Sequence, residues 1–215
     1  MKEELKDELI DNMQTVDDWF NWRAGKGQSV EQKRIGQINK LKWEYPDVLY
    51  SFLGVYTLGI WAYYKDDKEK GITLSGVIIK NKDGNYVYNS KYLANNYSEY
   101  SELNENEKLK DFIKQYSSIG NICPTWPGGN EHRGKSCCYD IPDIYFKRHK
   151  SWYKVLYRQN PNACLGSVVN SIYAVETSKF LKKIGNRVKY DAFLEHVNSV
   201  IEERKNILEG VEDEN

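Results

Sequence analysis

The side chains that could bind a ligand or react are concentrated in one stretch, residues 119–140. Arg133 stands there between Gly128-Gly129 and Gly134, where glycine lets the backbone adopt positive φ and approach a ligand closely. The arginine guanidinium offers five donors in a rigid fork that matches a carboxylate or a phosphate. This combination favours an anionic ligand, such as a nucleotide.

The same residues could instead have a purely structural role. Arg133 would then pair with Asp140 or Asp143 and hold the loop against the helix that follows. Both interpretations use one polar constellation at the start of a helix. The candidate ligand-binding residues are Trp126, Asn130, His132, Arg133, Asp140 and Asp143.

Cysteines near His132 raise the question of a metal or a nucleophile. Cys123, His132 and the pair Cys137-Cys138 could supply soft ligands, but their spacing lacks the paired knuckles of structural zinc sites. We therefore expect thiols and no metal, and the sequence names no cofactor. An enzyme would use His132 as acid, Arg133 as anion clamp and Asp140 as base.

Residues 129–136 match the Gly-x4-Gly-Lys-Ser pattern of a phosphate-binding P-loop. That loop requires an apolar strand before it and a helix that opens at the Lys-Ser pair. The segment Pro124-Thr125-Trp126-Pro127 precedes the first glycine, and Pro142 follows shortly after Ser136. The context argues against a nucleotide-hydrolysing P-loop.

Composition places the chain among folded proteins without a global attraction for nucleic acid. Of its 215 residues 40% are apolar, and Lys+Arg and Asp+Glu are both 31. Basic residues do gather in 133–154, where a solvated helix face is the simplest account. The first residues lack the apolar core of a secretory signal, so we expect a cytoplasmic protein.

Hydrophobic periodicity predicts an α+β fold that is predominantly α-helical, with a small β-hairpin or a small antiparallel sheet. We expect one domain over 1–215, and no membrane span, because the uncharged segment 48–64 is short and rich in tyrosine. Residues 92–106 are predicted as loop, and 107–116 as a short helix. The expected parts are a helical N-terminal region 1–65, a hairpin 72–89, the loop 119–140 and C-terminal helices 140–209.

Aromatic residues could provide stacking surfaces for bases, since the chain has six tryptophans and 17 tyrosines. Aromatic residues at helical spacing usually belong to a core, so Trp126 in the loop is the one we expect to be exposed and functional. His149 and His196 fall on expected helices and are interpreted as surface or capping residues.

Three short motifs carry a resemblance to a family of uncharacterised bacterial and phage proteins. They are Ile119-Gly120, Asn130-x-x-Arg133-Gly134 and Tyr139-Asp140-x-x-Asp143-Ile144, followed by Trp152-Tyr153. The resemblance covers roughly 116–208, including the ending Ile201-Glu202-Glu203-Arg204. It implies bacterial or phage origin and a shared fold, and it carries no activity.

Three functions remain as hypotheses. The first is a cytoplasmic binding or regulatory protein that recognises an anionic small molecule or a nucleotide. The second is an enzyme acting on nucleotides or nucleic acid. The third is a structural or subunit-contact protein, for which a homo-oligomer is left open.

Overall fold

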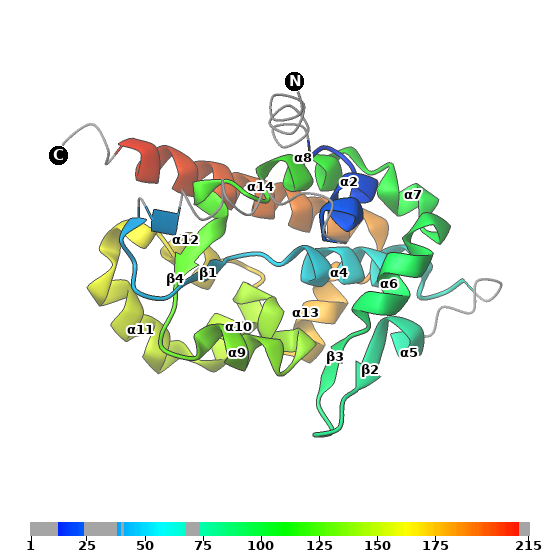
Figure 1. Cartoon of the computed structure of the whole chain (residues 1–215), viewed down its shortest axis with the longest axis horizontal. Helices are drawn as coiled ribbons and strands as arrows, with labels where there is room; N and C mark the ends of the chain where they lie inside the picture. The colour runs from blue at the N-terminus through cyan, green and yellow to red at the C-terminus, as the bar shows by residue number, and fades with distance from the viewer. Residues whose placement is uncertain (1–12, 24–37, 40, 68–73, 211–215) are drawn as a thin grey trace.

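Helices surround one buried helix near the centre of the molecule, and two small antiparallel sheets lie between and beside them (Figure 1). The computed structural model describes residues 13–23, 38–39, 41–67 and 74–210. The prediction of a predominantly helical α+β fold is confirmed. No helix in these ranges is long and apolar enough to cross a membrane.

The elements follow one another in a helix-rich order. The α-helices are α2 (Val16–Asn21), α4 (Phe52–Tyr64), α5 (Leu74–Val77), α6 (Ser90–Asn96), α7 (Ser101–Asn104), α8 (Glu107–Gln115), α9 (Gly129–Gly134), α10 (Pro142–Arg148), α11 (Lys150–Gln159), α12 (Gly166–Val169), α13 (Thr177–Ile184) and α14 (Arg187–Gly210). The strands are β1 (Pro46–Val48), β2 (Ile78–Lys80), β3 (Tyr86–Tyr88) and β4 (Ile122–Pro124). The 3₁₀ turns among the described residues are η2 (Tyr97–Glu99), η3 (Ile119–Asn121), η4 (Cys137–Asp140) and η5 (Pro161–Ala163).

Helix α4 forms the centre of the core because its residues are apolar on nearly every side, as expected of a buried helix. The Ser51 side chain caps its first turn by accepting from the Gly54 N–H at 3.4 Å. Helix α2 packs on it through aromatic rings, since Trp19 stacks on Phe52 with 4.0 Å between ring centroids. Tyr190 of α14 ties the same helix by donating to the Val55 carbonyl at 2.9 Å.

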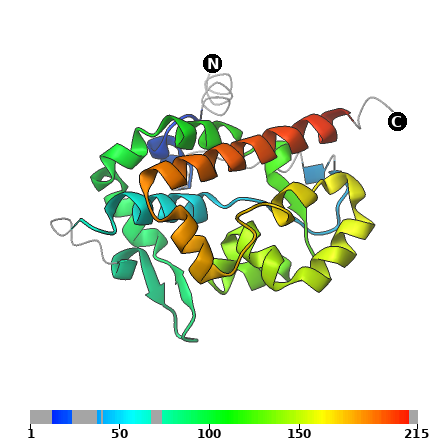
Figure 2. The same cartoon turned by 180° about the vertical axis from the view of Figure 1, so that it is seen from behind.

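Helix α14 runs along one side of the molecule, opposite α9, α10 and α11, and the two views agree on this arrangement (Figures 1 and 2). Its buried side chains recur every three or four residues, which is the period of one helix face. They are Tyr190, Phe193, Leu194, Val197, Val200, Ile201, Arg204 and Leu208. The turn η3 packs directly on this face. A Cβ on Gly120 would come within 2.0 Å of the Ile201 carbonyl oxygen, so only glycine allows this approach.

The short sheets have different partners in the chain. Strands β2 and β3 form a hairpin within the range predicted for it, 72–89, with Ile79 opposite Val87 and Gly84 at φ 78° in the turn. The hairpin is shorter than predicted, because 74–77 forms helix α5. Strand β1 pairs with the distant β4, with Asp47 opposite Cys123. The Asp83-Gly84 turn between β2 and β3 indicates the first pairing in the sequence. The second pairing joins segments that are more than seventy residues apart.

Several predicted elements were wrong. Pro46–Val48 is a strand, although we expected the region 1–65 to be helical, and the central helix begins at Phe52. Residues 92–106 are largely helical. The segment 119–140, expected to be a loop, contains η3, β4, α9 and η4, so its backbone is ordered by hydrogen bonds within the segment and with β1.

The helices predicted after residue 140 were correct in type and wrong in length. The first ends at Arg148, and His149 adopts a non-helical backbone before α11. The second is divided into α12 and α13, whereas the third is α14 as expected. Much of the helical N-terminal region expected over 1–65 lies outside the described residues.

Candidate functional site

Arg133, the centre of the predicted ligand site, is buried and surrounded by acceptors. Its Nη1 forms an ion pair with Asp47 at 2.8 Å and also donates to the Val48 carbonyl. Nη2 donates to the Leu49 carbonyl at 3.0 Å, and Nε donates to the Tyr139 carbonyl at 3.3 Å. Every nitrogen of the fork is occupied by the protein. Arg133 is therefore a clamp, as the structural explanation holds, but its carboxylate partner is Asp47 and not Asp140 or Asp143.

A second buried arginine, Arg204, also donates to backbone carbonyls, and one of them belongs to β4, the other strand of this sheet. Its side chain is fully buried and donates to the carbonyls of Gly120, Ile122 and Ala163. Burial lowers its pKa. Strands β1 and β4 form a sheet of only these two strands, so their outer carbonyls would lack partners. Arg133 donates to the carbonyls of Val48 in β1 and of Leu49 next to it, and Arg204 donates to the carbonyl of Ile122 in β4. These bonds take the role that a neighbouring strand has in a larger sheet.

Asn121 completes this polar core between the arginines. Its Oδ1 accepts from the Tyr50 N–H at 2.9 Å, and its Nδ2 donates to the carbonyls of Tyr50 and Tyr116. The side chain is fully buried. A buried amide with these bonds fixes the register of β1 against β4 without any ligand.

The other predicted site residues do not converge on Arg133 as ligands of one molecule. Asn130 is exposed on α9, whereas Asp140 is half-buried near Arg133. Burial raises the pKa of Asp140, and Arg133 lowers it in part. Asp143 is fully buried and accepts from the Tyr50 hydroxyl at 3.1 Å. Four of the five N–H donors of Arg133 are bound by other residues of the protein, and the arrangement of His132, Arg133 and Asp140 as acid, anion clamp and base stays a prediction.

Asp143 occupies a separate buried cluster on α10. The His196 Nε2 lies 3.8 Å from its Oδ1, and Tyr50 bonds its Oδ2. Burial raises the pKa of Asp143 to about 7, although hydrogen bonds from Tyr50 and Ser171 lower it in part. Burial also lowers the pKa of His196, so this imidazole is not a reliable counter-charge.

This raised pKa makes stability depend on pH. Between pH 4 and 7 the folded state keeps the Asp143 proton and the unfolded chain loses it, so the free energy of unfolding should fall as pH rises, by about 4 kcal/mol over that window. Urea unfolding of Asp143→Asn at several pH values should show a flatter slope. The exposed Asp111→Asn is the matched control, and an unchanged slope in Asp143→Asn would contradict the assignment.

Aromatic rings gather where α9, η4, α10 and α11 meet. This aromatic cluster consists of Trp126, His132, Tyr139, Tyr145, His149 and Trp152. Trp126 stacks on Tyr145 with an interplanar angle of 12°, and Trp152 packs on Trp126 in an edge-to-face arrangement with 5.0 Å between ring centroids. His132 stacks on Tyr139 at 4.9 Å. Trp126 is thus half-buried, and Trp152 is the more exposed ring at 55%.

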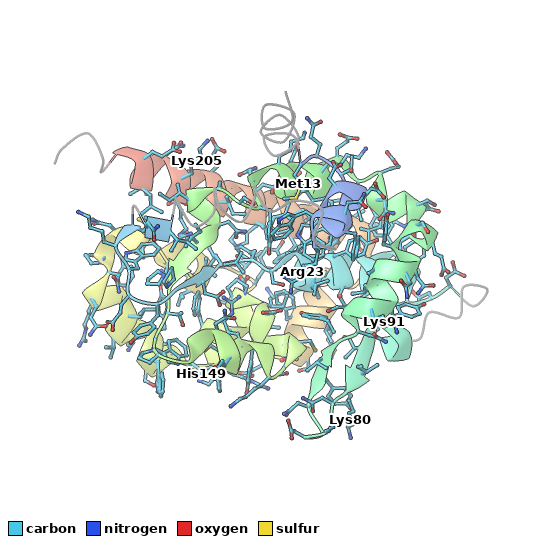
Figure 3. All side chains as sticks on the ribbon, in the orientation of Figure 1. Met13, Arg23, Lys80, Lys91, His149 and Lys205 are labelled. Atoms are coloured by element: carbon cyan, nitrogen blue, oxygen red, sulfur yellow. The ribbon has the colours of Figure 1, made fainter. Side chains whose placement is uncertain are left out.

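Exposed basic side chains are frequent on the segments that carry the aromatic cluster. The Arg148 guanidinium lies over the Tyr139 ring, 5.6 Å from its centroid. The side of the molecule that carries α9, α10 and α11 includes His149, labelled near its outer edge in Figure 3. Over residues 126–158 the exposed charged residues are Glu131, Lys135, Lys147, Arg148, Lys150, Lys154 and Arg158. One acid stands against six bases, so the local field is positive.

The four cysteines are free thiols in the structure. The four cysteines form no disulfide, and in the described ranges no three His, Cys, Asp or Glu side chains are placed to hold a metal ion. The formal P-loop match also has the wrong local structure. Gly129 to Gly134 form α9, so the helix ends before Lys135-Ser136 where a P-loop helix would begin.

Sequence reasoning missed the residues that complete these sites. Asp47 and Asn121 each have an apolar residue directly after them, and Arg204 lies in the charged run Glu202-Glu203-Arg204-Lys205. The one signal of a buried cation was that Arg204 falls on the apolar stripe of α14. His149 and Trp152 were assigned to one helix. The helix break at His149 brings their side chains beside Trp126 and His132.

We compared the chain with protein-family models, curated proteins and solved structures. No family model, curated protein or solved structure matched it.

Proposed function

We propose that this is a binding protein that recognises a nucleotide through the aromatic cluster and the basic residues around it. The observation that carries the proposal is the exposed Trp152 ring packed on Trp126, beside Arg148 over Tyr139. A flat aromatic surface binds a base by stacking, and a nearby guanidinium binds phosphate. The protein would act in the cytoplasm of a bacterium or on behalf of a phage, in line with the resemblance of its motifs.

This proposal moves the ligand away from Arg133, where the sequence first placed it. Arg133 holds β1, so the anion would bind the exposed cations Arg148, Lys147 and Lys150. His132 and Trp126 stay in the site as ring partners, and Asn130 stands near its edge. An enzyme would need a general acid and base facing one pocket, and no such arrangement favours that alternative among the described residues.

Titration of the protein with AMP and UMP, followed by tryptophan fluorescence, tests the proposal. Nucleotides should quench the emission, and ribose 5-phosphate, which has no base, should bind much more weakly. Trp152→Ala should weaken AMP binding by about tenfold, because stacking on a base contributes roughly 1–3 kcal/mol. Arg148→Gln should weaken binding and reduce its dependence on salt.

Matched controls exist on other elements. Tyr86→Ala removes an equally exposed ring from the hairpin, and Arg187→Gln removes an arginine that lies over Tyr63 at 4.6 Å. Both should bind AMP like the unmodified protein. Equal losses in Trp152→Ala and Tyr86→Ala, or equal affinity for AMP and ribose 5-phosphate, would refute a nucleotide site at the aromatic cluster.

A further inference from the structure

Helix α11 presents a row of three cations to solvent. This basic row consists of Lys150, Lys154 and Arg158, which are exposed and follow one another at intervals of four residues. An α-helix rises by about 1.5 Å per residue, so neighbouring members of the row are about 6 Å apart along the helix axis. This interval is close to the spacing of successive phosphates in an extended single strand of nucleic acid. The row can therefore meet three consecutive phosphates with one cation each.

The charge of the basic row is not compensated within the part of the chain that the structure describes. Other exposed lysines are paired: the Lys108 Nζ lies 2.6 Å from Glu195 and the Lys114 Nζ lies 2.9 Å from Asp111. No described carboxylate forms an ion pair with a member of the row. A row of uncompensated cations attracts a polyanion more strongly than a single anion, because each phosphate that it neutralises releases counterions.

Exposed surface continues around α11 from the basic row to Trp152. Because an α-helix turns by about 100° per residue, Val155 lies about 60° from Arg158 and about 60° from Trp152 around the helix axis. Val155 is 52% exposed and Trp152 is 55% exposed. The buried residues of α11, Tyr153 and Leu156, face the other side. A strand bound by its phosphates at the row can thus turn a base over Val155 onto the Trp152 ring.

Two polar side chains lie on this surface between the basic row and Trp152. Ser151 and Gln159 are both exposed, and their hydroxyl and amide groups donate and accept hydrogen bonds. The sugar of a nucleotide lies between its phosphate and its base, so these groups are placed where the sugar would lie. The ribose 2′-hydroxyl distinguishes RNA from DNA at such a position. The surface therefore favours RNA over DNA.

The position of α11 leaves room for a strand longer than one nucleotide. Both Figure 1 and Figure 2 show this helix at one end of the molecule, away from the β2–β3 hairpin. A duplex does not suit the surface, because its bases are paired and stacked on one another, whereas a single strand has bases that are free to stack on an aromatic side chain.

We propose that α11 binds single-stranded RNA, with the basic row on three successive phosphates and Trp152 against a base. This inference rests on the proposed function, because it uses the same aromatic cluster, and it extends the ligand from a mononucleotide to a strand. Stacking accepts every base, so binding depends on the length of the strand more than on its sequence.

Displacement of fluorescein-labelled octauridylate from the full chain, followed by fluorescence anisotropy, tests the proposal. UpU has one phosphate between its nucleosides and UpUpUpU has three, so UpUpUpU should bind at least about tenfold more tightly. The deoxyribose form of UpUpUpU should bind about threefold more weakly than the RNA, because it lacks the 2′-hydroxyls. An abasic RNA tetramer, which keeps the phosphates and has no base, should bind about tenfold more weakly than UpUpUpU.

Salt dependence counts the phosphates that are bound. Each neutralised phosphate of a single strand contributes about −0.7 to the slope of log K against log salt concentration. The slope should be about −2 for UpUpUpU and about −0.7 for UpU. A slope that is the same for both competitors would contradict a row of phosphate contacts.

A double variant assigns the added affinity to the basic row. Lys154→Gln/Arg158→Gln should weaken UpUpUpU binding by about tenfold and reduce its salt slope to about −0.7. AMP binding should stay unchanged, because the aromatic cluster and Arg148 remain. The matched control is Lys179→Gln/Lys182→Gln, which removes the same charge from exposed positions of α13 and should bind UpUpUpU like the unmodified protein. Circular dichroism verifies that each variant folds.

The outcomes separate this inference from the proposed function. Equal affinities of UpU and UpUpUpU, equal affinities of the RNA and DNA tetramers, or equal losses in the α11 and α13 variants would each overturn the RNA site. In each of these cases AMP binding that depends on Trp152 would leave the nucleotide site standing. An absence of AMP binding would refute the proposed function itself.

Discussion

Arg204→Met should destabilise the protein by about 4 kcal/mol or more, which is enough to unfold many domains of this size. Three backbone carbonyls, those of Gly120, Ile122 and Ala163, accept from the buried guanidinium. Methionine replaces the aliphatic part of the arginine side chain and has no donor, so these acceptors would remain buried without partners. Each hydrogen bond from a charged donor contributes roughly 1.5–3 kcal/mol.

Chemical denaturation measures this effect directly. The free energy of unfolding in urea should fall sharply for Arg204→Met and hardly at all for Arg158→Met, which changes an exposed arginine on α11. Arg204→Lys should also be strongly destabilised, because one ammonium cannot reach three carbonyls arranged around a planar fork. A loss below about 1 kcal/mol in Arg204→Met would show that the carbonyls find other partners.

Arg133→Met is expected to cost about 3–5 kcal/mol, because it leaves the Asp47 carboxylate buried without its cation. The effect should appear in the absence of any ligand, which distinguishes the clamp from a binding residue. In the double variant Asp47→Asn/Arg133→Met no charge is left unpaired, so part of the loss should be recovered.

A double-mutant cycle tests this coupling. Asp47→Asn, Arg133→Met and the double variant should give a coupling energy of about 1–3 kcal/mol, measured by urea unfolding. Lys114→Met and Asp111→Asn form the control cycle, since that ion pair is on the surface and should couple by less than about 1 kcal/mol. Additive losses at Asp47 and Arg133 would exclude the clamp.

Local signals in the sequence predicted much of the fold. The apolar run of α4, the Asp83-Gly84 turn of the hairpin and the periodic stripe of α14 each carry their structure in neighbouring residues. The pairing of β1 with β4 could not be predicted, because three-residue strands have too short a pattern. The division between α10 and α11 also lacks a glycine or proline at His149.

The candidate site was located in part. The sequence identified Trp126, His132 and Arg133 as neighbours, but it centred the ligand on Arg133, whose guanidinium is bound by other residues of the protein. Whether an arginine binds a ligand or the backbone depends on what the rest of the chain brings to it. Asp47 is 86 residues away from Arg133 in the sequence.

The packing of α14 on η3 also bears on how the protein is made. Gly120 and Ile122 acquire the Arg204 guanidinium only after the ribosome has added 84 and 82 further residues. At typical translation rates this delay is on the order of 5–15 s. During that time the apolar surface of α8 and η3 has no cover from α14, so a nascent chain is expected to depend on chaperones until its last helix emerges.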